Sequence, residues 1–300
     1  MLLSTIWSIS YLIQMDTLPE IKGRAKYKIN FSRNKIISKL KAFTKVKAIE
    51  SISYIAAVIK VDIESSDLVQ IKSIEGVRSI TPEIEYSRLL PIQELQQNNM
   101  YNRFSSIYTG KNIKVGIVDT GIDTNHPALH NRILHCKDFT KALNNCTDEI
   151  SHGTHVAGII ASTSVNHTGV SPDVLLGIYR VFAAKGGASH FSILQALDEA
   201  AKDKMDIINL SLGTPSGWDG GILEKAIKVL YEQQIIICGA SGNDGRDTLF
   251  VLSSPAISPY AIAVRSVNHD SIPSNFSSQG LGPLMEVKPD VMAPNKYIYS

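Results

Sequence analysis

Two residues suited to acid–base chemistry stand in short, distinctive blocks of this 300-residue sequence. Asp119 follows the apolar run 113–118, and His152 opens the run 152–158, which reads His-Gly-Thr-His-Val-Ala-Gly. A carboxylate at the end of an apolar run is costly to bury unless a partner satisfies it. A histidine suits that role, because a carboxylate can hold the imidazole in one tautomer while the other ring nitrogen takes up a proton. The pair therefore indicates an acid–base site.

Each block also has a purely structural explanation. Asp119 could simply cap a strand, and His152 with His155 could begin a metal site, although no third ligand accompanies them. A third block, Ala-Ser-Gly-Asn-Asp-Gly at 240–245, suits a tight turn equally well. The isoleucine-rich run before that block, and the presence of all three blocks in one chain, favour the chemical interpretation.

Together the three blocks resemble the subtilisin-like serine proteases, and the resemblance covers roughly residues 110–300. It implies that Asp119 orients His152, that His152 is the general base, and that the side-chain amide of Asn243 donates to the oxyanion. It also implies two walls of a substrate pocket, the first of which pairs with the substrate backbone. The wall residues are Ser211, Leu212 and Gly213 on one side and Ala240 and Gly242 on the other. The implied substrates are polypeptides.

The block that carries the nucleophile in this family, Gly-Thr-Ser-Met-Ala, does not occur in these 300 residues. Ser241, Ser277, Ser278 and Ser300 lack the sequence context of a nucleophile. We therefore expect a serine endopeptidase precursor whose sequence stops before the nucleophile and which is inactive as it stands. The alternative is a non-catalytic pseudoprotease, or a propeptide-type inhibitor that binds a partner.

The fold predicted for the region from residue 113 onward is α/β, because short apolar runs alternate there with amphipathic segments. Such strongly apolar strands indicate a doubly wound, mostly parallel sheet that is covered by helices on both faces. The resemblance implies that this sheet is of the subtilisin-like kind. Strands are predicted at 113–118, 174–181, 207–212, 235–240 and 261–267, and helices at 155–162, 191–202 and 221–233. Asp119 and the 240–245 block follow predicted strands, and active residues of such sheets gather at the carboxyl ends of the strands.

Residues 22–88 are predicted to form a small ferredoxin-like α+β domain in the order β-α-β-β-α-β, with a first strand at 27–31 and a closing strand at 77–84. By its place in the chain this domain resembles the propeptide of subtilisin-like precursors. The resemblance implies an intramolecular inhibitor whose C-terminal tail lies in the active-site cleft. An unrelated regulatory domain of the same common fold is the alternative.

The remaining boundaries follow from composition. Residues 89–110 form a polar linker, and 111–300 form the catalytic domain. Residues 1–21 hold an apolar stretch that suits a signal peptide or leader, although no basic residue precedes it. We expect a secreted or extracytoplasmic, monomeric protein on this basis. No stretch reaches transmembrane length, so we expect no stable membrane insertion.

Composition also restricts partners and cofactors. The formal net charge is +2, and ten basic residues between 22 and 47 suit a solvated face better than a nucleic-acid site, since no recognition motif accompanies them. No cofactor or metal is expected. Calcium occurs in the family, but Ala128 stands where an aspartate commonly supplies a ligand, which argues against the usual site. Cys136 and Cys146 bracket a polar loop and can pair if the chain is exported, whereas Cys238 suits a buried position.

Overall fold

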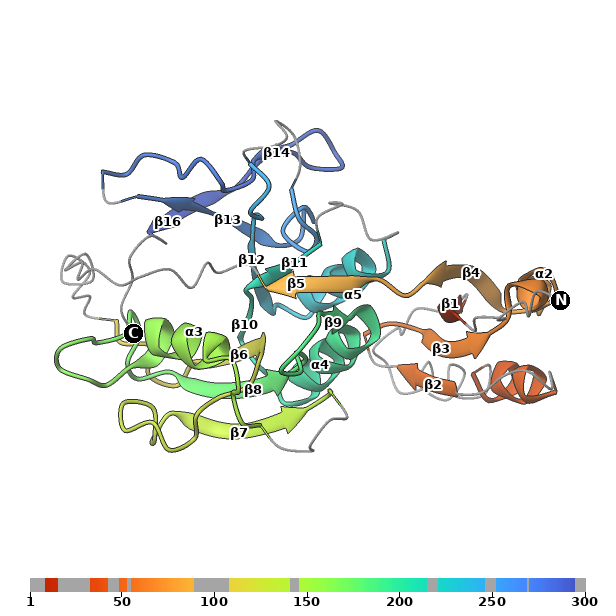
Figure 1. The fold of residues 1–300 in the computed structure, drawn as a ribbon, viewed down its shortest axis with the longest axis horizontal. Helices are drawn as coiled ribbons and strands as arrows, with labels where there is room; N and C mark the ends of the chain where they lie inside the picture. The colour runs from red at the N-terminus through yellow and green to blue at the C-terminus, as the bar shows by residue number, and fades with distance from the viewer. Residues whose placement is uncertain are drawn as a thin grey trace, which may run out of the picture. The chain divides into compact units, whose positions relative to one another are not determined.

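The computed structural model describes residues 9–15, 33–42, 49–52, 55–88, 108–140, 146–214, 221–245, 252–268 and 270–294. The chain divides into two compact units, Met1–Ile84 and Glu85–Ser300, whose elements are labelled in Figure 1. The predicted first domain extended to residue 88. In the structure residues 85–88 group with the second unit, because their backbone pairs with strands of that unit.

The first unit contains an antiparallel sheet in the order β2-β3-β1-β4. Its strands are β1 (Ile9–Met15), β2 (Ile49–Ile52), β3 (Val58–Ile63) and β4 (Val77–Pro82). A helix over 33–41 precedes β2, and the 3-10 turn η1 (Ser65–Asp67) with α2 (Leu68–Lys72) precedes β4. Helix and sheet meet in a buried cluster that includes Leu40, Ile59 and Ile71. The described residues therefore follow the predicted β-α-β-β-α-β order.

The first strand of this unit differs from the prediction. The predicted strand 27–31 lies outside the described residues. Ile9–Met15, within the segment expected to be a leader, forms β1 and pairs with β3 on one side and β4 on the other. A short apolar run has the same composition whether it is the core of a signal peptide or a central strand, so only its pairing distinguishes the two.

The second unit is built on a parallel sheet in the order β16-β13-β12-β10-β6-β8-β7. Its strands are β6 (Lys114–Asp119), β7 (Ile133–Asp138), β8 (Leu175–Arg180), β10 (Ile207–Leu210), β12 (Ile236–Ala240), β13 (Ile262–Val267) and β16 (Val291–Pro294). This confirms the predicted α/β sheet. Sequence patterns missed two strands, β7 and β16, which lie at the two edges of the sheet. An edge strand need not have apolar side chains at every position, so its pattern is weaker.

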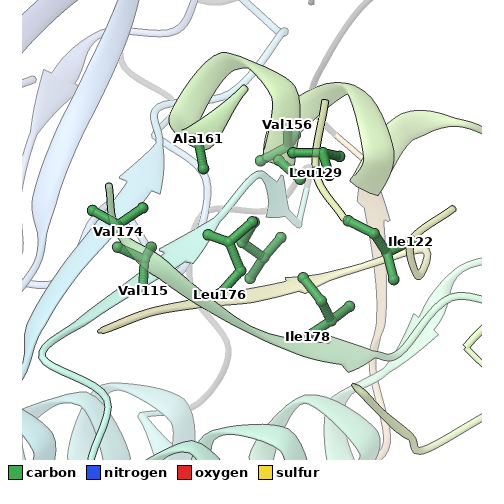
Figure 2. Close-up of a cluster of buried hydrophobic side chains, with 10 residues drawn as sticks. Val115, Ile122, Leu129, Val156, Ala161, Val174, Leu176 and Ile178 are labelled. Atoms are coloured by element: carbon green, nitrogen blue, oxygen red, sulfur yellow. The ribbon is translucent and has the colours of Figure 1, made fainter. Parts of the chain in front are cut away.

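Three long helices cover the sheet: α3 (His152–Ala161), α4 (His190–Lys202) and α5 (Ile222–Glu232). Figure 2 shows Val115, Leu176 and Ile178 pointing from β6 and β8 towards Val156 of α3. The intervening residues face the other way, since a Cβ on Gly177 would lie 3.0 Å from the side chain of Met205. Both faces are therefore covered, as near-continuous apolar strands require.

Two small sheets complete the second unit. In the first, β5 (Glu85–Arg88) lies between β11 (Leu212–Gly213) and β9 (Ala188–Ser189), antiparallel to both. The second joins β14 (Gly280–Leu281) to β15 (Val287–Lys288). Among the described residues, no helix is long and apolar enough to cross a membrane.

Candidate active site

Asp119 and His152 meet where β6 ends and α3 begins. The Nδ1 atom of His152 lies 2.6 Å from Oδ1 of Asp119, and the backbone N–H of Thr120 donates to the same oxygen at 2.7 Å. Asp119 is fully buried, and His152 is 1% exposed. The other ring nitrogen, Nε2, is buried without a hydrogen-bond partner among the residues that the structure describes. The imidazole is thus hydrogen-bonded at one nitrogen and, among the described residues, without a partner at the other.

Two glycines allow this close approach. Gly121, just after Asp119, has φ +116°, and a Cβ there would lie 2.4 Å from the carbonyl oxygen of Cys146. Gly153 follows His152, and a Cβ on it would lie 2.3 Å from the carbonyl oxygen of Gly121. A side chain at Gly153 would push the first turn of α3 away from the turn after β6, and one at Gly121 would displace the loop before α3.

Asn243 lies in the loop after β12 and is half-buried. In the sheet, β10 separates β12 from β6, so the two strands lie about 10 Å apart. The loop depends on Gly242 (φ +119°), where a Cβ would meet Ser253 and Ser278 at 2.5 and 2.7 Å. The structure therefore places Asn243 at the same carboxyl edge of the sheet as Asp119.

The predicted pocket walls partly converge. Ser211 and Ala240 line one cavity of about 170 Å³, together with Val156, Ile159 and Ile160 of α3. Leu212 and Gly213 form β11 instead, and their backbone pairs with β5. Gly242 lies in the loop beside Ala240. The cavity thus joins the two predicted walls to the helix that carries His152.

Sequence patterns missed the polar residues that hold the two partners. Asp148 accepts hydrogen bonds from the hydroxyl groups of Thr120 and Thr154 at 2.8 and 2.6 Å. Burial alone would raise the pKa of Asp148, but the hydrogen bonds from Thr154, Thr120 and Ile150 outweigh it and lower the pKa below its usual value. The only available signal was an aspartate four positions before a histidine that opens a helix.

The loop that carries Asp148 is anchored at both ends of its described part. Cys146 forms a disulfide with Cys136 of β7. Glu149 forms a 2.8 Å ion pair with Arg180, which is 1% exposed at the end of β8. The sequence left the cysteine pairing open, and the structure forms it.

The three described serines that sequence reasoning set aside bond elsewhere. The hydroxyl oxygens of Ser241 and Ser277 lie 3.1 Å apart, and that of Ser278 accepts from the backbone N–H of Asp244. Since Nε2 of His152 has no hydrogen-bond partner in the described structure, none of these hydroxyls is bonded to it.

No group of three or more His, Cys, Asp or Glu side chains that could hold a metal ion occurs among the described residues. Ala128, at the place where the family commonly has an aspartate, is buried and offers no ligand. No step of the chemistry is assigned to a metal.

Comparison with known families decides the classification. The sequence profile of the subtilase family matches residues 110–299, more than half of the chain. The chain belongs to the subtilase family. Its parallel sheet, with Asp119 and His152 at one edge, is the subtilisin-like fold.

This subtilase is 34% identical over 238 residues to the "Major intracellular serine protease" of Bacillus subtilis (strain 168), which covers 75% of this chain and 72% of that protein. It is also 34% identical to "Subtilisin amylosacchariticus" of Bacillus subtilis subsp. amylosacchariticus, over 72% of this chain and 55% of that protein. The match therefore spans only part of each relative. A crystal structure of the epidermin leader peptide processing serine protease from Staphylococcus aureus has the same fold, with TM-score 0.73 at 19% identity, covering 96% of this chain and 75% of that one.

Proposed function

We propose that this subtilase carries the acid–base half of a serine endopeptidase site that hydrolyses polypeptides. Asp119, as a carboxylate, accepts from Nδ1 of His152 and holds the tautomer in which Nε2 is unprotonated. Nε2 then takes the proton of an attacking serine hydroxyl and later delivers it to the leaving amine. Asn243 donates to the oxyanion that forms when the hydroxyl attacks the peptide carbonyl.

One observation carries this proposal: the 2.6 Å contact at Nδ1 together with a buried Nε2 that has no hydrogen-bond partner among the described residues. A histidine that served only to stabilise the fold would be expected to use both ring nitrogens, because a buried polar atom without a partner is costly. A ring nitrogen without a partner among the described residues is what a general base needs before its partner hydroxyl is present.

The 300 residues contain no Gly-Thr-Ser-Met-Ala block, the block that the resemblance assigns to the nucleophilic serine. We therefore propose that these residues by themselves do not hydrolyse peptides through the Asp119–His152 pair. Incubation of the refolded 300-residue chain with an unfolded protein substrate tests this. Hydrolysis that His152→Ala abolishes would contradict the proposal that the nucleophile lies outside these residues.

A further test needs the nucleophile. We expect a protein that joins these residues to a Gly-Thr-Ser-Met-Ala-like block to hydrolyse unfolded proteins. His152→Ala and Asp119→Ala should each lower kcat by at least about 10⁴-fold, because residues of such a triad act as a unit. An extended protein whose activity survives His152→Ala would disprove the assignment of the base.

The first unit together with β5, the strand that follows it in the second unit, acts in our proposal as an intramolecular propeptide, with β5 as its C-terminal tail. The resemblance assigns Ser211–Gly213 to pairing with the substrate backbone, and this place is taken by β5, with Leu212 opposite Arg88 and Gly213 opposite Ser87. Tyr86 of β5 is fully buried, and its ring centroid lies 5.5 Å from that of His190. A strand anchored in this way would exclude a substrate strand.

Tyr86→Ala tests the propeptide proposal. Removing a buried aromatic side chain should loosen β5, so the backbone amide hydrogens of Leu212 and Gly213 should exchange faster with solvent, and a fluorescent peptide should bind more tightly. Glu85→Ala, which alters an exposed side chain of the same strand, is the matched control. Unchanged peptide affinity in Tyr86→Ala would argue against occupancy of the substrate site by β5.

The non-catalytic alternative predicts a different result. A pseudoprotease or inhibitor should form a stable complex with a partner protease, and His152→Ala should leave the affinity of that complex unchanged.

A secreted or extracytoplasmic location is supported by the Cys136–Cys146 disulfide, because such bonds persist in oxidising compartments. Mass spectrometry of the natively isolated protein, with free thiols blocked, tests it: two free thiols at these positions would exclude an oxidising location.

A further inference from the structure

The Asp148 carboxylate collects five hydrogen bonds. Its Oδ1 accepts from the Thr120 hydroxyl at 2.8 Å, from the Ser151 N–H at 2.8 Å and from the Ile150 N–H at 3.1 Å. Its Oδ2 accepts from both the backbone N–H and the hydroxyl of Thr154, at 2.8 and 2.6 Å. One carboxylate thus joins the turn after β6 to the residues on either side of His152.

The partners of Asp148 lie next to the proposed catalytic residues. Thr120 follows Asp119 and donates its backbone N–H to the same oxygen that faces His152. The Thr120 hydroxyl also accepts from the N–H of Gly153 at 2.8 Å. Asp148 therefore accepts hydrogen bonds from residues next to both Asp119 and His152, although none of its five hydrogen bonds is to either of these two side chains.

The first turn of α3 depends on these contacts because it has no local cap. Ser151, at the N-cap position, is left-handed (φ 66°), and its side chain accepts no capping hydrogen bond. The helix N–H groups that a cap would satisfy are instead bonded by Thr120 and Asp148. The angle at which α3 presents His152 to β6 is thus set across the tertiary structure.

A carboxylate is required at this place. The Thr120 and Thr154 hydroxyls each already accept a hydrogen bond, from Gly153 and Asp123 respectively, so their single hydrogens point to Asp148. Every group that faces Asp148 in these bonds is then a donor. An asparagine would turn its NH₂ group towards at least one of them, which replaces an attraction by a repulsion.

Building on the proposed function, we propose that Asp148 is a positioning residue, whose carboxylate fixes the first turn of α3 against the end of β6 so that His152 keeps Nδ1 on Asp119 and Nε2 open. Asp148 touches no reacting atom in this scheme. Its effect reaches the reaction only through the orientation and tautomer of the imidazole.

Nuclear magnetic resonance of the 300-residue chain, labelled with ¹⁵N in its histidine rings, tests this without any nucleophile. Asp148→Asn should shift the His152 ring signals towards mixed tautomers and abolish the low-field Nδ1 proton signal. Glu149→Gln, which changes the adjacent residue and its ion pair with Arg180, should leave the His152 signals in place. A folded Asp148→Asn chain with unaltered His152 signals would overturn the proposal.

A second pair of variants covers a failure of Asp148→Asn to fold. Thr154→Val removes one hydroxyl donor and should change the His152 signals in the same direction, by less, whereas Thr154→Ser keeps that donor and should not. No difference between the two would overturn the proposal. Asp119→Asn separates this result from the proposed function: if it leaves the His152 signals unchanged, the Asp119–His152 assignment itself fails, whatever Asp148 does.

Discussion

The backbone at Gly153 lies so near Gly121 that a Cβ on Gly153 would approach the Gly121 carbonyl oxygen to 2.3 Å. This contact joins the first turn of α3 to the turn after β6, and it fixes how closely His152 approaches Asp119. Gly153→Ala should therefore destabilise the protein by about 1–3 kcal/mol, because a rigid backbone atom must move to admit the methyl group. Urea unfolding measures the loss. Val165→Ala, at a 93% exposed position, should stay within about 0.5 kcal/mol of the parent chain.

Asp148 makes stability depend on pH on the acidic side. Its pKa is lowered in the folded protein, because the hydrogen bonds outweigh the cost of burial. The unfolded chain then binds a proton more readily, with a pKa of about 3.9. The stabilisation is complete above that value and is lost as pH falls through the lower folded pKa. Unfolding midpoints measured from pH 6 to pH 2 should fall less steeply in Asp148→Asn; equal slopes would contradict the prediction.

The Cys136–Cys146 disulfide should contribute about 2–4 kcal/mol, since it restricts the unfolded chain and ties β7 to the loop that carries Asp148. The double variant Cys136→Ser, Cys146→Ser should unfold at correspondingly lower urea. The parent chain in excess reductant should match it. Cys238→Ala provides the control, since Cys238 is a free thiol. Unfolding of this variant should remain sensitive to reductant.

Tyr179 joins a polar group on β7, β8 and α4. Its hydroxyl donates to Asp203 at 2.8 Å, and Lys137 bridges Asp203 and Glu199 at 2.8 and 2.9 Å. Burial, followed by the Asp203 carboxylate, raises the pKa of Tyr179, so the hydroxyl remains a donor far into the alkaline range. Tyr179→Phe should cost about 0.5–1.5 kcal/mol. Tyr231→Phe, at a 58% exposed position, should be neutral, and equal losses in both variants would show that the Asp203 bond contributes nothing.

The limits of sequence reasoning are clearest in the first unit. Periodicity correctly predicted the order of the elements and a closing strand from Val77. It did not identify Ile9–Met15 as the strand between β3 and β4, because the composition of an apolar run does not predict which strands it will pair with. Nor did it identify the pairing partners of Glu85–Arg88, which lie more than a hundred positions away in the sequence.

By itself the sequence determined the residue types and the order of the elements: an aspartate after an apolar strand, a histidine opening a helix, and an asparagine in a glycine-rich turn. Those features depend on local periodicity and on short motifs, which the chain carries along its length. Only the tertiary structure decided that Nδ1 of His152 meets Asp119, that Cys146 bonds Cys136, and that Asp148 holds both sides of the site. Hydrogen bonds and covalent links of this kind depend on the distances between atoms, and distances between remote segments exist only once the sheet and its helices have packed together.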